Sequence, residues 1–100
     1  MPSYEMVYVL RPSIPDDEVE QAIERVNAIV TSRGGTVEKT DLWGRRRLAY
    51  RLQDYPEYRE GIYVLTEFSC PPQATSAIEG LLRINEDVMR HLVVRRTKRE

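Results

Sequence analysis

The sequence predicts an α+β domain in which a four-stranded antiparallel sheet carries two helices on one of its faces. Four short segments alternate apolar and polar residues with the period of two that is typical of strands, and two longer segments place apolar residues at the spacing of a helix. In chain order these segments read strand, helix, strand, strand, helix, strand. A chain of 100 residues has room for one core, which a sheet covered by helices on one face would fill.

The first predicted strand covers residues 4–11. One of its faces is wholly apolar and consists of Tyr4, Met6, Tyr8 and Leu10. The other face consists of Glu5, Val7, Val9 and Arg11, so charged ends enclose two valines. We expect the first face to meet the helices. The valines of the second face indicate a central strand or a partly covered face.

A helix is predicted between Ser13 and Gly34. Ser13 is the expected N-cap, Pro15 lies in the first turn, and the acidic residues 16–18 suit the positive end of the helix dipole. Helical spacing predicts a buried stripe that consists of Val19, Ala22, Ile23, Val26 and Val30. Gly34 and Gly35 supply the left-handed residue that ends many helices.

The second strand is predicted over residues 36–52, where Gly44 marks an expected bulge or bend. A polar loop over residues 54–61 leads to the third strand, residues 62–68. Glu67 is expected to face water, which sets the alternation of that strand. Its buried side then consists of Ile62, Val64, Thr66 and Phe68, and its open side holds Tyr63 and Leu65.

Pro71 and Pro72 end the third strand and begin the second helix. The apolar stripe of this helix consists of Ala74, Ala77, Ile78, Leu81 and Leu82. Asn85 or Asp87 begins the exit towards the last strand, residues 88–94, in which the alternation leaves open which side chains face the core.

Right-handed crossovers turn this order of elements into the ferredoxin-like βαββαβ sandwich, with the sheet order 4-1-3-2. The first and third strands are then central, and the second and fourth are edges. We expect one such domain over residues 1–96, followed by a flexible basic tail over residues 97–100.

Charge is divided into blocks along the chain although the formal net charge is only −1. Residues 1–30 carry two basic and six acidic side chains, whereas residues 31–54 carry six basic and three acidic ones. Residues 55–82 are acidic again and residues 83–100 are basic. The two basic blocks belong to the predicted edge strands, so a local positive field can exist without a basic average.

The most basic stretch of the chain is Trp43-Gly44-Arg45-Arg46-Arg47-Leu48-Ala49-Tyr50. Guanidinium groups bind phosphate through a planar fork of donors, and a strand would hold them in a fixed geometry. We interpret the stretch as an anion-binding edge for nucleic acid; the alternative is a solubilising edge, because charge also prevents edge strands from pairing. The expected RNA-binding residues are Arg45, Arg46, Arg47, Arg90, Arg95, Arg96, Lys98 and Arg99.

Catalytic side chains are scarce in this sequence. His91 is the only histidine and has apolar neighbours, so we expect a structural role or a polar edge position rather than a base. Cys70 is the only cysteine and is expected to be a packed, inert thiol, in keeping with a reducing cytoplasm. We expect no enzyme activity, cofactor, metal, small-molecule substrate or membrane span.

The open face of the sheet indicates how the domain would bind. The RNA-recognition motif shares this topology but stacks bases on aromatic residues of its central strands, where this chain has Val7 and Val9. Phosphate and shape recognition are therefore favoured. With Tyr63 and Leu65 these valines form an apolar face that predicts a protein partner, the alternative being ordinary scattered exposure.

Several segments together resemble a known family, the sixth protein of the bacterial small ribosomal subunit. They are Tyr4-Glu5, Val9-Leu10-Arg11-Pro12, Gly44-Arg45-Arg46-Arg47-Leu48-Ala49-Tyr50, Gly61-Ile62-Tyr63 and the run from Leu82 to Arg95. The resemblance implies a ferredoxin-like fold without enzyme activity. It also implies binding to the central domain of small-subunit ribosomal RNA, as a heterodimer with the eighteenth protein of that subunit. One departure is Pro2-Ser3, where members of the family often carry basic residues.

Two other classes of protein share the predicted topology. A regulatory or ligand-sensing domain that dimerises through its sheet would carry glycine and acidic residues in its first loop, where this chain has Arg11-Pro12-Ser13-Ile14. An acylphosphate hydrolase would need a phosphate-cradling loop after its first strand, and that loop is missing. A ribosomal, cytoplasmic RNA-binding protein is therefore the favoured interpretation.

Overall fold

The computed structural model describes residues 1–49 and 52–96 of the chain. The strands are β1 (Ser3–Leu10), β2 (Thr36–Arg47), β3 (Glu60–Ser69) and β4 (Val88–Arg95), and the helices are α1 (Val19–Ser32) and α2 (Thr75–Ile84). Short 3-10 turns, Asp16–Glu18 and Pro72–Ala74, precede the two helices. The expected flexible tail, with Lys98 and Arg99, lies outside the described residues.

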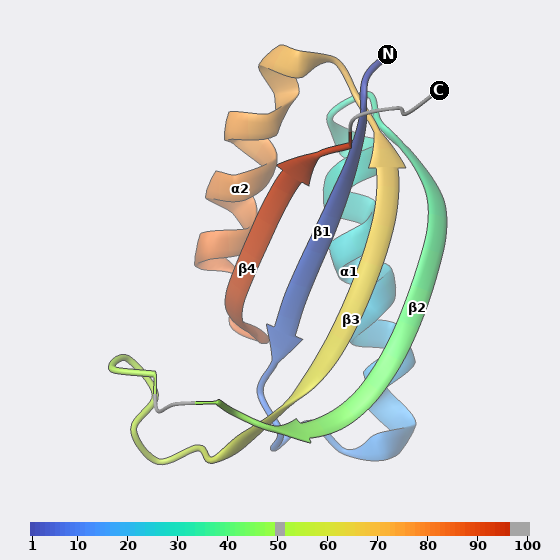
Figure 1. Cartoon of the computed structure of the whole chain (residues 1–100). Helices are drawn as coiled ribbons and strands as arrows, with labels where there is room; N and C mark the ends of the chain where they lie inside the picture. Colours follow the sequence, from blue (N-terminus) through green and yellow to red (C-terminus); the bar gives the residue numbers. More distant parts are fainter. Residues whose placement is uncertain (50–51, 97–100) are drawn as a thin grey trace.

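The four strands form one antiparallel sheet in the order β2-β3-β1-β4, with both helices on one face (Figure 1). This is the predicted ferredoxin-like α+β fold. β1 and β3 lie in the centre because each is bonded to a strand on either side, and β2 and β4 are the edges. The open face, which we define as the sheet face opposite the helices, has no helix over it (Figure 1).

The core lies between the sheet and the two helices, as the alternation predicts. The inward residues of β1 and β3 are at most 6% exposed: Tyr4, Met6, Tyr8, Leu10, Ile62, Val64, Thr66 and Phe68. The rings of Tyr4 and Phe68 stack with centroids 5.5 Å apart. The five predicted stripe residues of α1 are all buried, and α2 buries Ile78 and Leu82.

The prediction of Ser13 as a helix N-cap is wrong. The chain enters α1 through the 3-10 turn Asp16–Glu18, whose N-cap is Pro15 and which has no side-chain cap. The Ser13 hydroxyl instead accepts a hydrogen bond from Arg11 and lies 3.2 Å from the Tyr58 hydroxyl. The end of α1 is as predicted: Gly34 is left-handed, with φ of 81°, and its N–H donates to the carbonyl of Thr31.

The second strand is shorter than predicted. Gly44 lies at a break in the register with β3 and has φ of 92°, which confirms the expected bulge. The strand ends at Arg47, opposite Glu60, the first residue of β3. The N–H of Leu48 donates once more, to the carbonyl of Arg59 at 2.9 Å, and beyond it the chain is a loop in which Leu52 is only 6% exposed. Tyr50 and Arg51 lie outside the described residues.

The register between β1 and β4 decides the alternation that the sequence leaves open. Leu92 lies opposite Val7, and Arg90 lies opposite Val9, so both β4 residues belong to the open face. His91 lies opposite Tyr8 and therefore faces the helix layer. A register shift between Val9 and Leu10 accommodates one extra β4 residue at the start of the strand.

Candidate nucleic-acid and partner interface

The described arginines that we expect to bind RNA lie at two different ends of the sheet. Arg46 and Arg47 at the end of β2 lie near the end of β1, because their β3 partners adjoin Ile62, which pairs with Leu10. Arg90 lies at the same end, opposite Val9. Arg95 lies opposite Tyr4, five residues back along β1, which is roughly 17 Å at the rise of a strand.

Arg45 is directed towards the helix layer and holds the loop that follows β1. Its guanidinium donates to the carbonyls of Pro12 (2.6 Å) and Ile14 (3.0 Å) and to Oδ1 of Asp16 (2.9 Å). Strand alternation places Arg45 and Arg47 on the helix side and Arg46 on the open side, and Arg45 is the one whose donors are engaged inside the domain. Arg45 therefore acts as a clamp between β2 and the start of the first helical turn.

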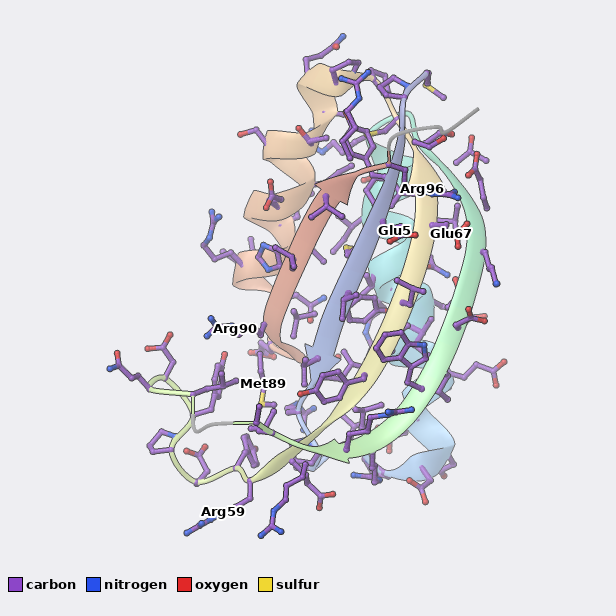
Figure 2. The ribbon with its side chains drawn as sticks, viewed as in Figure 1. Glu5, Arg59, Glu67, Met89, Arg90 and Arg96 are labelled. Carbon is purple, nitrogen blue, oxygen red and sulfur yellow. The ribbon has the colours of Figure 1, made fainter. Side chains whose placement is uncertain are left out.

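Arg46 and Arg47 are both exposed and lie on opposite sides of β2. The Arg46 guanidinium lies 5.5 Å from the centroid of the Trp43 ring, a cation–π arrangement that restricts both side chains. Arg59, in the loop before β3, extends into solvent at this same end of the molecule (Figure 2). Arg59 is not among the expected RNA-binding residues, because a lone arginine in a polar loop forms no sequence pattern that would indicate a binding site.

Arg96 lies beside two glutamates at the other end of the sheet (Figure 2). Its guanidinium lies 3.0 Å from Glu67 and 3.7 Å from Glu5, two carboxylates of the open face. Arg95 is exposed on the helix side of β4. Pairing with two carboxylates lowers the positive field that Arg96 can offer to a phosphate.

The open face carries a continuous apolar surface. Val7, Val9, Tyr63 and Leu65 lie on this face as the alternation predicts, because they pair across β1 and β3. Val7, Tyr63 and Leu65 are half-buried, whereas Val9 is only 7% exposed. Leu92, 63% exposed, and Val94, 46% exposed, extend this surface onto β4. A cavity of about 430 Å³ opens where the loop residues Leu48, Ala49 and Leu52 approach Val7, Val9, Tyr63 and Leu92, beside Arg90.

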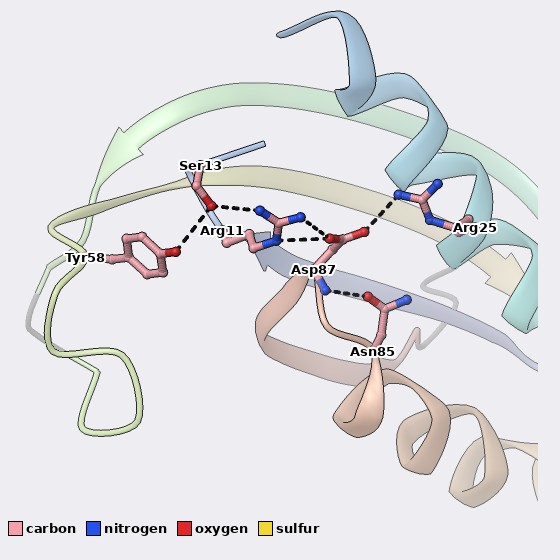
Figure 3. Close-up of polar contacts among 6 residues, drawn as sticks. All are labelled: Arg11, Ser13, Arg25, Tyr58, Asn85 and Asp87. Carbon is pink, nitrogen blue, oxygen red and sulfur yellow. Dashed lines mark hydrogen bonds and ion pairs between the residues drawn. The ribbon is translucent and has the colours of Figure 1, made fainter. Parts of the chain in front are cut away.

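A polar network around Asp87 ties the end of β1, α1 and the start of β4 together (Figure 3). Its Oδ1 accepts from Arg11, at 2.9 Å from Nη2, and its Oδ2 accepts from Arg25 at 2.9 Å. Through Ser13 the network reaches Tyr58 in the loop before β3. The network therefore positions the loop that borders the open face.

Asp87 is only 8% exposed. Burial raises the pKa of its carboxyl, but hydrogen bonds from Arg25 and Arg11 and the charges of both guanidinium groups outweigh burial, so the pKa lies below its ordinary value. The network is thus stabilising when Asp87 is ionised.

We expect Asp87→Asn to lower the free energy of unfolding at pH 7 by about 1–3 kcal/mol, the range for hydrogen bonds to a charged group. Because the folded-state pKa is depressed, the ionised network stabilises fully above the unfolded pKa of about 4 and is lost as the pH falls through the folded pKa. Urea unfolding from pH 7 to pH 2 should therefore show a smaller acid-dependent loss in the variant. Asp17→Asn, at an exposed position, is the control and should follow the parent chain.

We expect substitutions of the three arginines of β2 to have different effects on stability and on RNA affinity. Arg45→Ala should cost about 1 kcal/mol of stability, because it removes hydrogen bonds to two carbonyls and a carboxylate. Arg46→Ala with Arg47→Ala should leave stability within about 0.5 kcal/mol but reduce the salt dependence of RNA affinity by about two units of log–log slope. Urea unfolding and RNA titrations over a salt series measure the two effects. An unchanged slope in the double variant would remove Arg46 and Arg47 from the RNA site.

Cys70 is packed in the core, as expected, and His91 lies against α2. Cys70 is fully buried, and burial raises the pKa of its thiol, which disfavours the reactive thiolate. His91 lies 3.6 Å from Glu79 of α2; burial lowers its pKa, and Arg83 adds to this while Glu79 opposes it. Across residues 1–49 and 52–96 no group of three or more acidic, histidine or cysteine side chains could hold a metal ion. Within the same residues no helix has the length and apolar content to cross a membrane.

The fold and these surfaces define a small α+β domain with an apolar sheet face that no helix covers and with arginines at both ends of the sheet. The sequence profile of one family, described as ribosomal protein S6, matches residues 3–95. The small ribosomal subunit protein bS6 of Desulforamulus reducens is 36% identical over 95% of this chain and 97% of its own length. The same protein of an Exiguobacterium species is 40% identical over 95% and 97%.

A solved structure agrees with these sequence matches. The crystal structure of 30S ribosomal protein S6 from Thermotoga maritima superposes with a TM-score of 0.84 and 29% identity, covering 95% of this chain and 87% of that one. The chain belongs to the ribosomal protein S6 family. It is thereby a structural, non-enzymatic component of the small subunit of the cytoplasmic ribosome, as the sequence resemblance implies.

Proposed function

We propose that this chain binds the central domain of small-subunit ribosomal RNA together with the eighteenth protein of that subunit. The open face is the protein-binding surface in this proposal, with Val7, Val9, Tyr63 and Leu65 at its centre. The exposed arginines near its two ends contact RNA phosphates. The apolar continuity of the open face is the observation that carries the proposal.

The apolar surface of the open face supports a protein partner, because it extends beyond the four predicted residues. Leu92 and Val94 are strongly exposed beside them, and the cavity of about 430 Å³ offers a concave seat for an apolar side chain. Contiguous apolar surface of this kind is characteristic of interaction sites on soluble proteins. Glu5 and Glu67 at one end and Arg90 at the other give the surface a polar rim of both signs.

The RNA contacts are proposed for Arg46, Arg47, Arg59 and Arg90 at one end of the sheet, and for Arg95 and Arg96 at the other. Lys98 and Arg99, which lie outside the described residues, are proposed as further contacts. Among residues 1–49 and 52–96, no carboxylate forms an ion pair with Arg46, whereas Arg45 and Arg96 pair with carboxylates. Arginine forks bind phosphate without reading sequence. We therefore assign the stronger phosphate contacts to Arg46 and Arg47, and a positioning role to Arg45.

A titration of ribosomal RNA with this protein, with and without saturating partner, tests the proposal. The partner should raise the apparent affinity by at least about tenfold, or roughly 1.4 kcal/mol of coupling, because two weak surfaces then act as one. Equal affinities in the two titrations would contradict the cooperative part of the proposal and make this chain an independent RNA binder. No measurable RNA binding in either titration would contradict it entirely.

A further inference from the structure

A second groove lies in the other layer of the molecule, between α1 and the edge strand β2. Its volume is about 550 Å³. Val19 and Ile23 of α1 form part of its lining and are 7% and 8% exposed. Leu42 of β2 lines the opposite side and is 55% exposed. Covering Leu42 with a ligand would remove its apolar surface from water, which favours association.

The rim of this groove is acidic. Glu20 and Glu24, four residues apart on α1, lie on the same side of the helix and line the groove with Asp16. Asp16 is paired with Arg45, whereas neither glutamate forms an ion pair within the part of the chain that the structure describes. The charge of the rim favours a cationic ligand and repels RNA phosphates, so the groove and the proposed RNA contacts have opposite preferences.

One feature of the groove calls for a hydrogen-bonding partner. Beside the groove runs β2, which ends the sheet order β2-β3-β1-β4 and so presents one side of its backbone without a neighbouring strand. An edge of this kind accepts an added strand from another chain, with alternate side chains of that strand directed to each face.

We infer that this groove docks an extended segment rich in lysine and arginine from a neighbouring protein, paired along β2 over Thr40 and Leu42. Basic side chains on one face of the added strand lie over Glu20 and Glu24, and apolar atoms of the segment cover Leu42. The surface is separate from the open face, because Leu42 pairs opposite the inward-facing Val64 whereas Tyr63 and Leu65 face the other way.

The test uses the whole chain and a labelled peptide that alternates lysine and valine over nine residues, with capped termini. Fluorescence anisotropy at low ionic strength should give saturable binding, and amide chemical shifts should change around Thr40, Leu42 and Glu24. Glu20→Gln with Glu24→Gln should weaken binding by at least about fivefold, because it removes both rim charges. Glu57→Gln with Glu86→Gln removes two exposed charges elsewhere and should change binding by less than about twofold.

Absence of saturable binding, equal affinity of the rim variant and the control variant, or shifts confined to Val7 and Leu92 would each overturn the inference. A second measurement places a photo-crosslinking amino acid at position 42 in reconstituted small subunits. A crosslink to a lysine- and arginine-rich protein segment supports the inference, and a crosslink to RNA overturns it. RNA affinity with and without the open-face partner is measured separately, so failure at this groove is distinguishable from failure of the proposed function.

Discussion

Leu92→Glu is expected to abolish most of the gain in RNA affinity that the partner protein confers, at least about a tenfold loss. Leu92 lies on the open face opposite Val7, is 63% exposed and lines the cavity formed with Leu52 and Tyr63. A carboxylate placed there would have to lose its water when the partner covers the face, and burial of an unpaired charge is costly. The measurement is the RNA titration with saturating partner.

Ile84→Glu is the matched control for this substitution. Ile84 is an equally large apolar residue, 75% exposed, but it lies at the end of α2 in the helix layer. The control should retain the full effect of the partner, and both variants should unfold at urea concentrations close to that of the parent chain, because both sites are exposed. If the two glutamate variants lost the partner effect equally, the open face would not be the surface that carries it.

Phe68→Ala is expected to lower the free energy of unfolding by about 3–5 kcal/mol, a large part of the stability of a domain of this size. Phe68 is fully buried on the inward side of β3, and its ring stacks on Tyr4 of the neighbouring strand. Truncation to alanine removes the ring and leaves a cavity between sheet and helices that the surrounding side chains only partly refill.

Urea unfolding followed by circular dichroism measures this loss, and Phe68→Leu is the control. The leucine variant keeps most of the apolar volume and should lose only about 1–2 kcal/mol. Phe68 lies on the helix side of the sheet and not on the open face, so RNA affinity corrected for the folded fraction should be unchanged in both variants. A loss below about 1 kcal/mol for the alanine variant would contradict the central position of Phe68 in the core.

The core and the sheet order could be predicted from the sequence because they follow from short-range periodicity. The alternation of β1 and β3 and the spacing of Val19, Ala22, Ile23, Val26 and Val30 identify the buried faces without any knowledge of neighbours. A right-handed crossover then leaves few arrangements for two helices and four strands. The glycine at position 44 predicts its own bulge, since a positive φ suits a residue without a Cβ.

The ends of elements were less predictable. Ser13 has the chemistry of an N-cap, but Arg11 and Tyr58 engage its hydroxyl, and Tyr58 is 45 residues distant along the chain. The second strand ends at Arg47, opposite the first residue of β3, with one more hydrogen bond from Leu48 to Arg59, so its end is a property of two segments rather than of one. A local sequence pattern shows which hydrogen bonds a residue favours, but partners distant in the sequence determine which of these bonds form.

The sequence by itself determined the fold, the apolar stripe of the open face and the family to which the chain belongs. Only the tertiary structure decided which arginines are available to a ligand: Arg45 is held by Pro12, Ile14 and Asp16, Arg46 lies over Trp43, and Arg96 pairs with Glu5 and Glu67. The physical reason is that a guanidinium on a long, flexible stem takes the acceptors it can reach in space, and these acceptors come from other segments of the chain.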